Sequence, residues 1–271
     1  MITNMRYALW KKDDDEALAL LREMFPSDQL RKLEEKINSR LSNQNMFSAN
    51  ERVEYKLVAY WIGLSKRSIN LFDQTLDVMH SGHVFAAPIL ARSFLENLGA
   101  TVLFSKKLRH AIKQGQDDDL KRIYSFFTQA DRFMLELDQD PSVDDLYLTS
   151  EARSRRTKRQ TQAPKAPHVN DGLDEAKKRI ARKFNKTAQT TFSDQYSVLC
   201  EATHPSRTSI LHALLNIYTE TSIGKISYAQ QIEFNVGKSL TFLWLSFEDW
   251  EEVLTSLNNR IVSYGDPHLI T

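Results

Sequence analysis

The chain has 271 residues, of which 41% are hydrophobic and 26% charged, with one cysteine, seven prolines and eight glycines. This composition is ordinary for a globular protein, and a single cysteine excludes an internal disulfide framework. The scarcity of glycine and proline predicts few, long secondary-structure elements. The formal net charge of +1 is unevenly spread, because residues 151–186 hold 12 Lys/Arg against 4 Asp/Glu and the remainder carries −7.

The most apolar stretch, residues 84–104, is about long enough to cross a bilayer, but Arg92 and Glu96 stand near its centre. Each charge would cost about 2.5–3.5 kcal/mol at that depth. The first 16 residues also lack the apolar core of a secretory signal. We therefore expect a buried helix here, and a cytoplasmic protein with no membrane partner.

Apolar residues recur three and four positions apart along most of the chain, and no sustained alternation is present, which predicts an all-α fold. In chain order, we expect helices over residues 13–24, 28–41, 49–79, 83–106, 118–137, 171–184, 193–203, 205–218 and 228–257. Such a set is typical of a helical bundle of about eight to ten helices.

The chain divides into three parts by composition. Residues 150–168 contain no aliphatic side chain larger than alanine, so this segment cannot bury itself. We expect residues 1–137 to form the N-terminal part of one bundle, residues 138–170 a basic loop or linker, and residues 171–271 the C-terminal helices that complete the same bundle.

The basic loop has the electrostatic pattern of nucleic-acid binding through phosphates. Its cations are Arg153, Arg155, Arg156, Lys158 and Arg159. No aromatic residue interrupts the loop, so base stacking is not expected within it. The alternative is a solvated loop that docks on acidic parts of the chain itself, such as residues 13–16 or 117–119.

Arg92 and Glu96 are four residues apart, so they share one face of an otherwise apolar helix. Charges on such a face require partners, because an unpaired buried charge is too costly to persist. One interpretation is an internal ion pair that ties this helix to its neighbours. The other is that one of the two lines a polar pocket inside the bundle.

The second polar constellation lies around the sequence His-Pro-Ser-Arg. Pro205 disfavours helix at His204 and suits the first turn of a following helix. We expect His204 at the N-cap, with Ser206 and Arg207 in the first turn, where free N–H groups would meet an anion or phosphate. The alternative is that His-Pro-Ser is only a helix-start signal.

Residues 207–212, Arg-Thr-Ser-Ile-Leu-His, match an Arg-x4-6-His pattern and resemble HEPN-like helical ribonucleases. Enzymes of that kind are common among bacterial toxins and antiphage systems, and their Arg and His act on the RNA phosphodiester. The resemblance implies metal-independent RNA cleavage that uses Arg207 and His212. Because His212 lies about 140° from Arg207 around a helix, the pair would need a partner surface.

The pairing of residues 90–97, LARSFLEN, with Tyr196, Leu199 and residues 204–206 is similar to a second group of proteins. These bacterial helical proteins combine an Arg-x3-Glu helix with a later Tyr…His-Pro-Ser segment. The similarity covers roughly residues 49–257 and implies no activity. It does imply that Arg92, Glu96 and His204 meet in space.

Our leading hypothesis is a HEPN-like, metal-independent ribonuclease or defence effector that needs no cofactor. In it His204 or His212 serves as general base, Arg207 stabilises the phosphorane and Glu96 orients the base. The expected partners are RNA or another phosphate-bearing ligand, held by the basic loop, and a second copy of the chain. The competing hypothesis is a non-enzymatic helical interaction or oligomerisation module, in which the polar cluster is structural.

Overall fold

The computed structural model describes residues 27–41, 51–83, 85–115, 117–128, 168–204, 209–210, 218–221 and 224–269. Its helices are α3 (Ser27–Arg40), α4 (Val53–His80), α5 (Ala86–Gln114), α6 (Asp117–Thr128), α8 (Val169–Lys183), α9 (Lys186–Thr203), α11 (Tyr228–Leu240), the 3₁₀ helix η3 (Thr241–Ser246) and α12 (Trp250–Ser263). The predicted all-α helical bundle is confirmed for this part of the chain. The total of eight to ten helices stays a prediction, since residues 1–26 and 129–167 lie outside the description.

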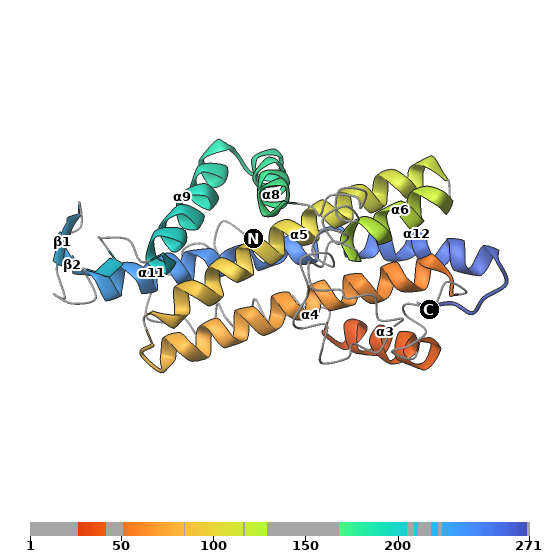
Figure 1. The fold of residues 1–271 in the computed structure, drawn as a ribbon, viewed down its shortest axis with the longest axis horizontal. Helices are drawn as coiled ribbons and strands as arrows, with labels where there is room; N and C mark the ends of the chain where they lie inside the picture. Colours follow the sequence, from red (N-terminus) through yellow and green to blue (C-terminus); the bar gives the residue numbers. More distant parts are fainter. Residues whose placement is uncertain are drawn as a thin grey trace, which may run out of the picture.

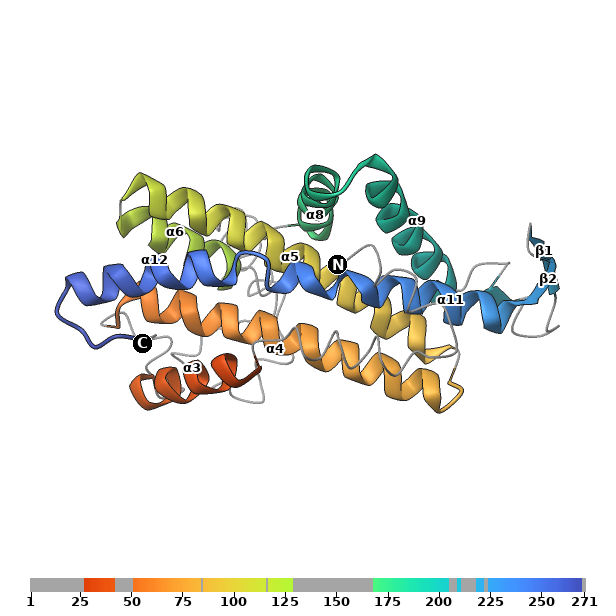
Figure 2. The ribbon, with the colours of Figure 1, turned by 180° about the vertical axis from the view of Figure 1, so that it is seen from behind.

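Three long rods run along the length of the molecule: α4, α5, and the line formed by α11, η3 and α12 (Figures 1 and 2). A tight turn joins α4 to the antiparallel α5, and Gly82 adopts φ +72° there, a left-handed conformation that glycine tolerates. The shorter helices α3, α6 and α8 pack around the rods, and α9 runs down to the end of the bundle at which α5 and α11 begin (Figure 1).

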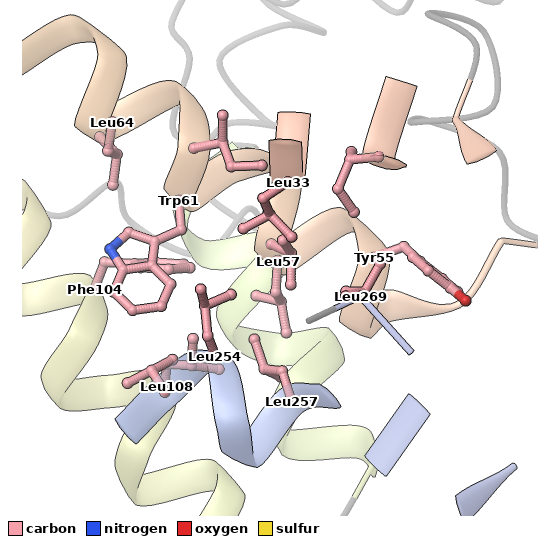
Figure 3. Close-up of a cluster of buried hydrophobic side chains, with 14 of the residues drawn as sticks. Leu33, Tyr55, Leu57, Trp61, Leu64, Phe104, Leu108, Leu254, Leu257 and Leu269 are labelled. Carbon is pink, nitrogen blue, oxygen red and sulfur yellow. The ribbon is translucent and has the colours of Figure 1, made fainter. Parts of the chain in front are cut away.

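The apolar side chains form two clusters along the bundle. One joins α3, α4, α6, α12 and the second half of α5, with Trp61 and Phe104 among its buried members (Figure 3). The other joins the first half of α5 to the second half of α4 and to α8, α9, α11 and η3, around Phe94 and Phe192. Leu30, Leu33, Ile37 and Leu41, which recur three or four positions apart along α3 and at its end, are all buried, as expected from the apolar periodicity of the sequence.

The helix predicted over residues 228–257 is wrong as one continuous element. α11 ends at Leu240, η3 covers the next six residues, and a turn precedes α12. A buried polar network marks the break: Ser246 Oγ lies 2.7 Å from Ser68 Oγ, which accepts a hydrogen bond from Asn97 Nδ2 at 2.7 Å. Buried polar groups require hydrogen-bond partners, and Ser246, at the end of η3, is such a partner for the buried Ser68 hydroxyl.

Several other boundaries also differ from the predicted ones. α5 continues to Gln114, eight residues past its predicted end, and stops at Gly115 with φ +74°. α9 begins at Lys186, capped by the Asn185 side chain, instead of at residue 193. α8 begins at Val169, so His168, which caps it, belongs to the helix start and not to the loop. The predicted segments 13–24, 129–137 and 138–167 lie outside the described residues.

The sequence predicted a helix that ends at residue 218, followed by a connection. Residues 218–221 instead form strand β1 (Tyr218–Thr221), which pairs antiparallel with β2 (Gly224–Ser227). This hairpin of two four-residue strands is the only sheet in the described part of the chain. No helix in that part is both long and apolar enough to cross a membrane.

Candidate functional site

Arg92 and Glu96 form an ion pair on the side of α5 that faces α9. Arg92 Nε donates a hydrogen bond to Glu96 Oε1 at 2.9 Å, and the two side chains are 28% and 29% exposed. The pair is therefore partly open to solvent and is not sealed in the core. A pair in this position stabilises the fold only modestly, yet it is accessible to a ligand.

The last turns of α9 complete a polar cluster around this pair. Tyr196 Oη donates to Glu96 Oε1 at 3.0 Å, so one carboxylate oxygen accepts from both Arg92 and Tyr196. Arg92 Nη1 donates to Thr203 Oγ1 at 3.1 Å and lies 3.4 Å from His204 Nε2. One guanidinium thus bridges α5 and the end of α9, and brings Glu96 and His204 into one cluster.

The nature of the contact between Arg92 and His204 depends on the tautomer of the imidazole. A guanidinium can only donate hydrogen bonds, so the nitrogen facing it must offer a lone pair. His204 Nε2 is that nitrogen, so the contact is a hydrogen bond only when the imidazole carries its proton on Nδ1. The separation of 3.4 Å is long for a hydrogen bond, so a better donor can displace it.

The backbone at His204 differs from the prediction in one respect. His204 is extended, with φ −88° and ψ 146°, as expected before proline, but it is the C-cap of α9 and its N–H donates to Cys200 O at 3.1 Å. His204 therefore lies at the carbonyl end of α9 and not at the start of a helix. The proposed N-cap role involves residues 205–208, which lie outside the described residues.

Burial and hydrogen bonding tune two groups of the cluster. Desolvation by burial, the largest single effect, lowers the pKa of Arg92, but the hydrogen bond to Glu96 together with the nearby Cys200, Glu96 and Tyr196 raises this pKa above its ordinary value. Burial, followed by the hydrogen bond to Glu96 and the proximity of Cys200, raises the pKa of Tyr196 well above 10. Arg92 is thus held charged and Tyr196 is held neutral at physiological pH.

We expect Tyr196 to resist ionisation until well above pH 10, the pKa of tyrosine in an unfolded chain. Because the folded chain holds this proton more tightly, the resulting stability is complete below pH 10 and is lost as the pH rises through the higher folded pKa. The ionisation of Tyr196 is measured as the tyrosinate absorbance of wild type minus that of Tyr196→Phe over a pH titration. Circular dichroism checks that both proteins are folded. A difference titration centred near pH 10 would contradict the cluster.

The structure does not place every residue that the sequence singled out. Arg207, His212 and the basic-loop residues Arg153, Arg155, Arg156, Lys158 and Arg159 lie outside the described residues. Sequence reasoning did not assign Tyr196 or Thr203 to the site. The similarity to the Arg-x3-Glu proteins contained Tyr196 as a signal, whereas nothing in the local sequence marked Thr203.

The basic helix after the loop is engaged with the bundle. Arg179 Nε donates to Glu248 Oε2 at 2.8 Å, Arg179 also pairs with Asp249, and Lys183 Nζ lies 2.9 Å from Glu248 Oε1. Arg179 is only 16% exposed. These cations of α8 serve the fold at the break between η3 and α12, so they are poorly placed to bind phosphates.

Among the described residues, no group of three or more His, Cys, Asp or Glu side chains is arranged to hold a metal ion. No family model matches the chain, and no curated protein or solved structure matches it. Function is therefore inferred from the chain's own residues and their contacts.

Proposed function

We propose that the chain is a HEPN-like, metal-independent ribonuclease that acts as a toxin or antiphage effector, with Arg92, Glu96, Tyr196 and His204 in its site. The observation that carries the proposal is the position of the Arg92 guanidinium, which contacts Glu96 and also lies 3.4 Å from the exposed imidazole of His204. A fixed cation next to an imidazole can supply charge stabilisation and a general base for phosphodiester cleavage without a metal.

In the proposed reaction His204 Nε2 accepts the proton of a ribose 2′-hydroxyl, and the 2′-oxygen attacks the adjacent phosphorus. Arg92 stabilises the negative charge that develops on the phosphoryl oxygens. The P–O5′ bond then breaks, and the leaving 5′-oxygen takes a proton from an imidazolium, for which His212 is a candidate. The products are a 2′,3′-cyclic phosphate and a 5′-hydroxyl.

The contacts suggest a different task for Glu96 from the one expected. Glu96 Oε1 accepts from Arg92 and Tyr196, and Arg92 lies between Glu96 and His204. Glu96 and Tyr196 thus orient the guanidinium, and the guanidinium orients the imidazole. Arg207 remains a proposed second phosphate contact, and the basic loop remains a proposed RNA-binding segment. We also propose that the protein acts in the cytoplasm as a homo-oligomer.

The test is incubation of a labelled RNA pool with the wild-type chain in EDTA, followed by analysis of the fragment ends. We expect cleavage that survives EDTA and leaves 2′,3′-cyclic phosphates and 5′-hydroxyls. Cleavage that requires a divalent cation, fragments with 3′-hydroxyl ends, or intact RNA throughout would each contradict the proposal.

A second candidate function is a non-enzymatic interaction or oligomerisation module. It is favoured by Phe85 and Ile89, which are 57% and 54% exposed at the start of α5. Salt distinguishes the two functions. Affinity for RNA phosphates falls steeply as ionic strength rises, whereas association through apolar helix packing scarcely responds.

A further inference from the structure

Two large apolar side chains lie exposed at the beginning of α5, close in sequence to the candidate site. Phe85 is 57% exposed and Ile89 is 54% exposed, whereas Phe94 and Leu95 on the same helix are fully buried. Single exposed apolar residues are common, but these two lie four positions apart, so they are neighbours on one face of the helix and form a small apolar patch.

The patch continues directly into the polar cluster. Phe85, Ile89, Arg92 and Glu96 are spaced four, three and four residues apart, which places them within about 60° of one another around an α-helix. Phe85 precedes the first residue of α5 and already has helical dihedral angles, φ −85° and ψ −26°, so the stripe extends to it. The rise of the helix separates the Cα atoms of Phe85 and Arg92 by roughly 10 Å.

Arg92 retains hydrogen-bonding capacity for a ligand. A guanidinium has five N–H donors, and the contacts of Arg92 with Glu96, Thr203 and His204 use Nε and Nη1. Within the described residues Nη2 has no partner. The stripe therefore offers an aromatic and an aliphatic side chain at one end and a cation with free donors at the other.

We propose that this stripe binds an unpaired nucleotide of single-stranded RNA, with the base on Phe85 and Ile89 and its phosphate at Arg92 and His204. The inference rests on the proposed function and specifies its substrate class. A nucleotide has a flat apolar face and an anionic group separated by a distance of this order. Bases stack on exposed aromatic side chains only when they are released from a helix, so the site selects single strands over duplexes.

The test measures binding without cleavage, by fluorescence anisotropy of a short labelled RNA whose 2′-hydroxyls are methylated. We expect Phe85→Ala to weaken binding about tenfold and Phe85→Trp to preserve it, because stacking on one aromatic ring contributes a factor of this size. Tyr264→Ala is the control, since Tyr264 is an exposed aromatic residue, 45% exposed, after α12 at the other end of the bundle. A strand with abasic sites should bind the wild type as weakly as the intact strand binds Phe85→Ala.

Equal RNA affinity of wild type and Phe85→Ala would overturn the inference. So would a Phe85→Ala variant that loses self-association in light scattering but keeps its RNA affinity, because the patch would then bind a second copy of the chain. If unmodified RNA is cleaved but its analogue binds equally well with or without Phe85, only the proposed base site is excluded. If binding of single strands depends on Phe85 but unmodified RNA is not cleaved, the proposed ribonuclease activity is excluded and the proposed base site is supported.

Discussion

The His204→Ala variant is expected to cleave RNA about 10²–10⁴-fold more slowly than wild type while remaining folded. His204 supplies the only imidazole that contacts Arg92 in the described part of the chain, and without it the 2′-hydroxyl loses its base. The side chain is exposed at the end of α9 and belongs to neither apolar cluster, so its removal costs the fold little. Single-turnover cleavage in EDTA, with circular dichroism of each protein, measures the effect.

His110→Ala provides the matched control for this prediction. His110 is also an exposed histidine, on the last turns of α5, where it contacts the Gln114 side chain at 3.1 Å. Its substitution should leave the cleavage rate unchanged. A folded His204→Ala variant that cleaves at the wild-type rate, or equal losses in both variants, would exclude His204 as the base.

Gly172→Ala is expected to destabilise the fold by about 3 kcal/mol, a large effect for the addition of one methyl group. α8 crosses α5 where Gly172 meets Gly99, and a Cβ on Gly172 would lie 2.7 Å from the carbonyl carbon of Gly99. The obstructing atoms are backbone, so no side-chain rotation can relieve the contact. The two helices would have to separate, which would loosen the buried Leu173 and Ala176.

Gly63→Ala is the control for this crossing, because Gly63 lies exposed within α4 and a Cβ there has nothing within 4 Å. This substitution should stabilise the chain by about 0.5–1 kcal/mol, since alanine favours the helix more than glycine does. Urea unfolding of both variants gives the two free energies. A Gly172→Ala variant as stable as wild type would mean that α8 does not cross α5 at this pair.

Much of the fold follows from the spacing of apolar residues, as α3 and α4 illustrate. Their buried apolar residues recur with the period of an α-helix, so the existence and approximate extent of both helices could be predicted from the sequence. The same period concealed the break at residues 241–246, because an amphipathic pattern continues through η3. At the break Ser246 contacts the Ser68 hydroxyl on α4, a tertiary partner that local sequence does not reveal.

The hairpin could not be predicted from the spacing of apolar residues. Strands β1 and β2 have four residues each, too few for a period of two to stand out. The neighbouring segment 210–217, which is rich in apolar residues, dominated the pattern and favoured a helix that ran on to residue 218.

The candidate site was predictable in its parts but not in its assembly. The spacing of Arg92 and Glu96 predicted their pairing, and Pro205 predicted an extended His204. Their meeting depends on how α9 packs against α5, which is a property of the whole bundle. Thr203 entered the site only through that packing, since no rule of spacing connects it with a residue more than 100 positions away.

The most direct test of a shared site is a double-mutant cycle between Arg92 and His204, followed by single-turnover RNA cleavage in EDTA. If the guanidinium and the imidazole act as one unit, Arg92→Ala combined with His204→Ala should cleave no more slowly than the more damaged single variant. Losses that multiply in the double variant would show that the two residues act independently, and would contradict the account.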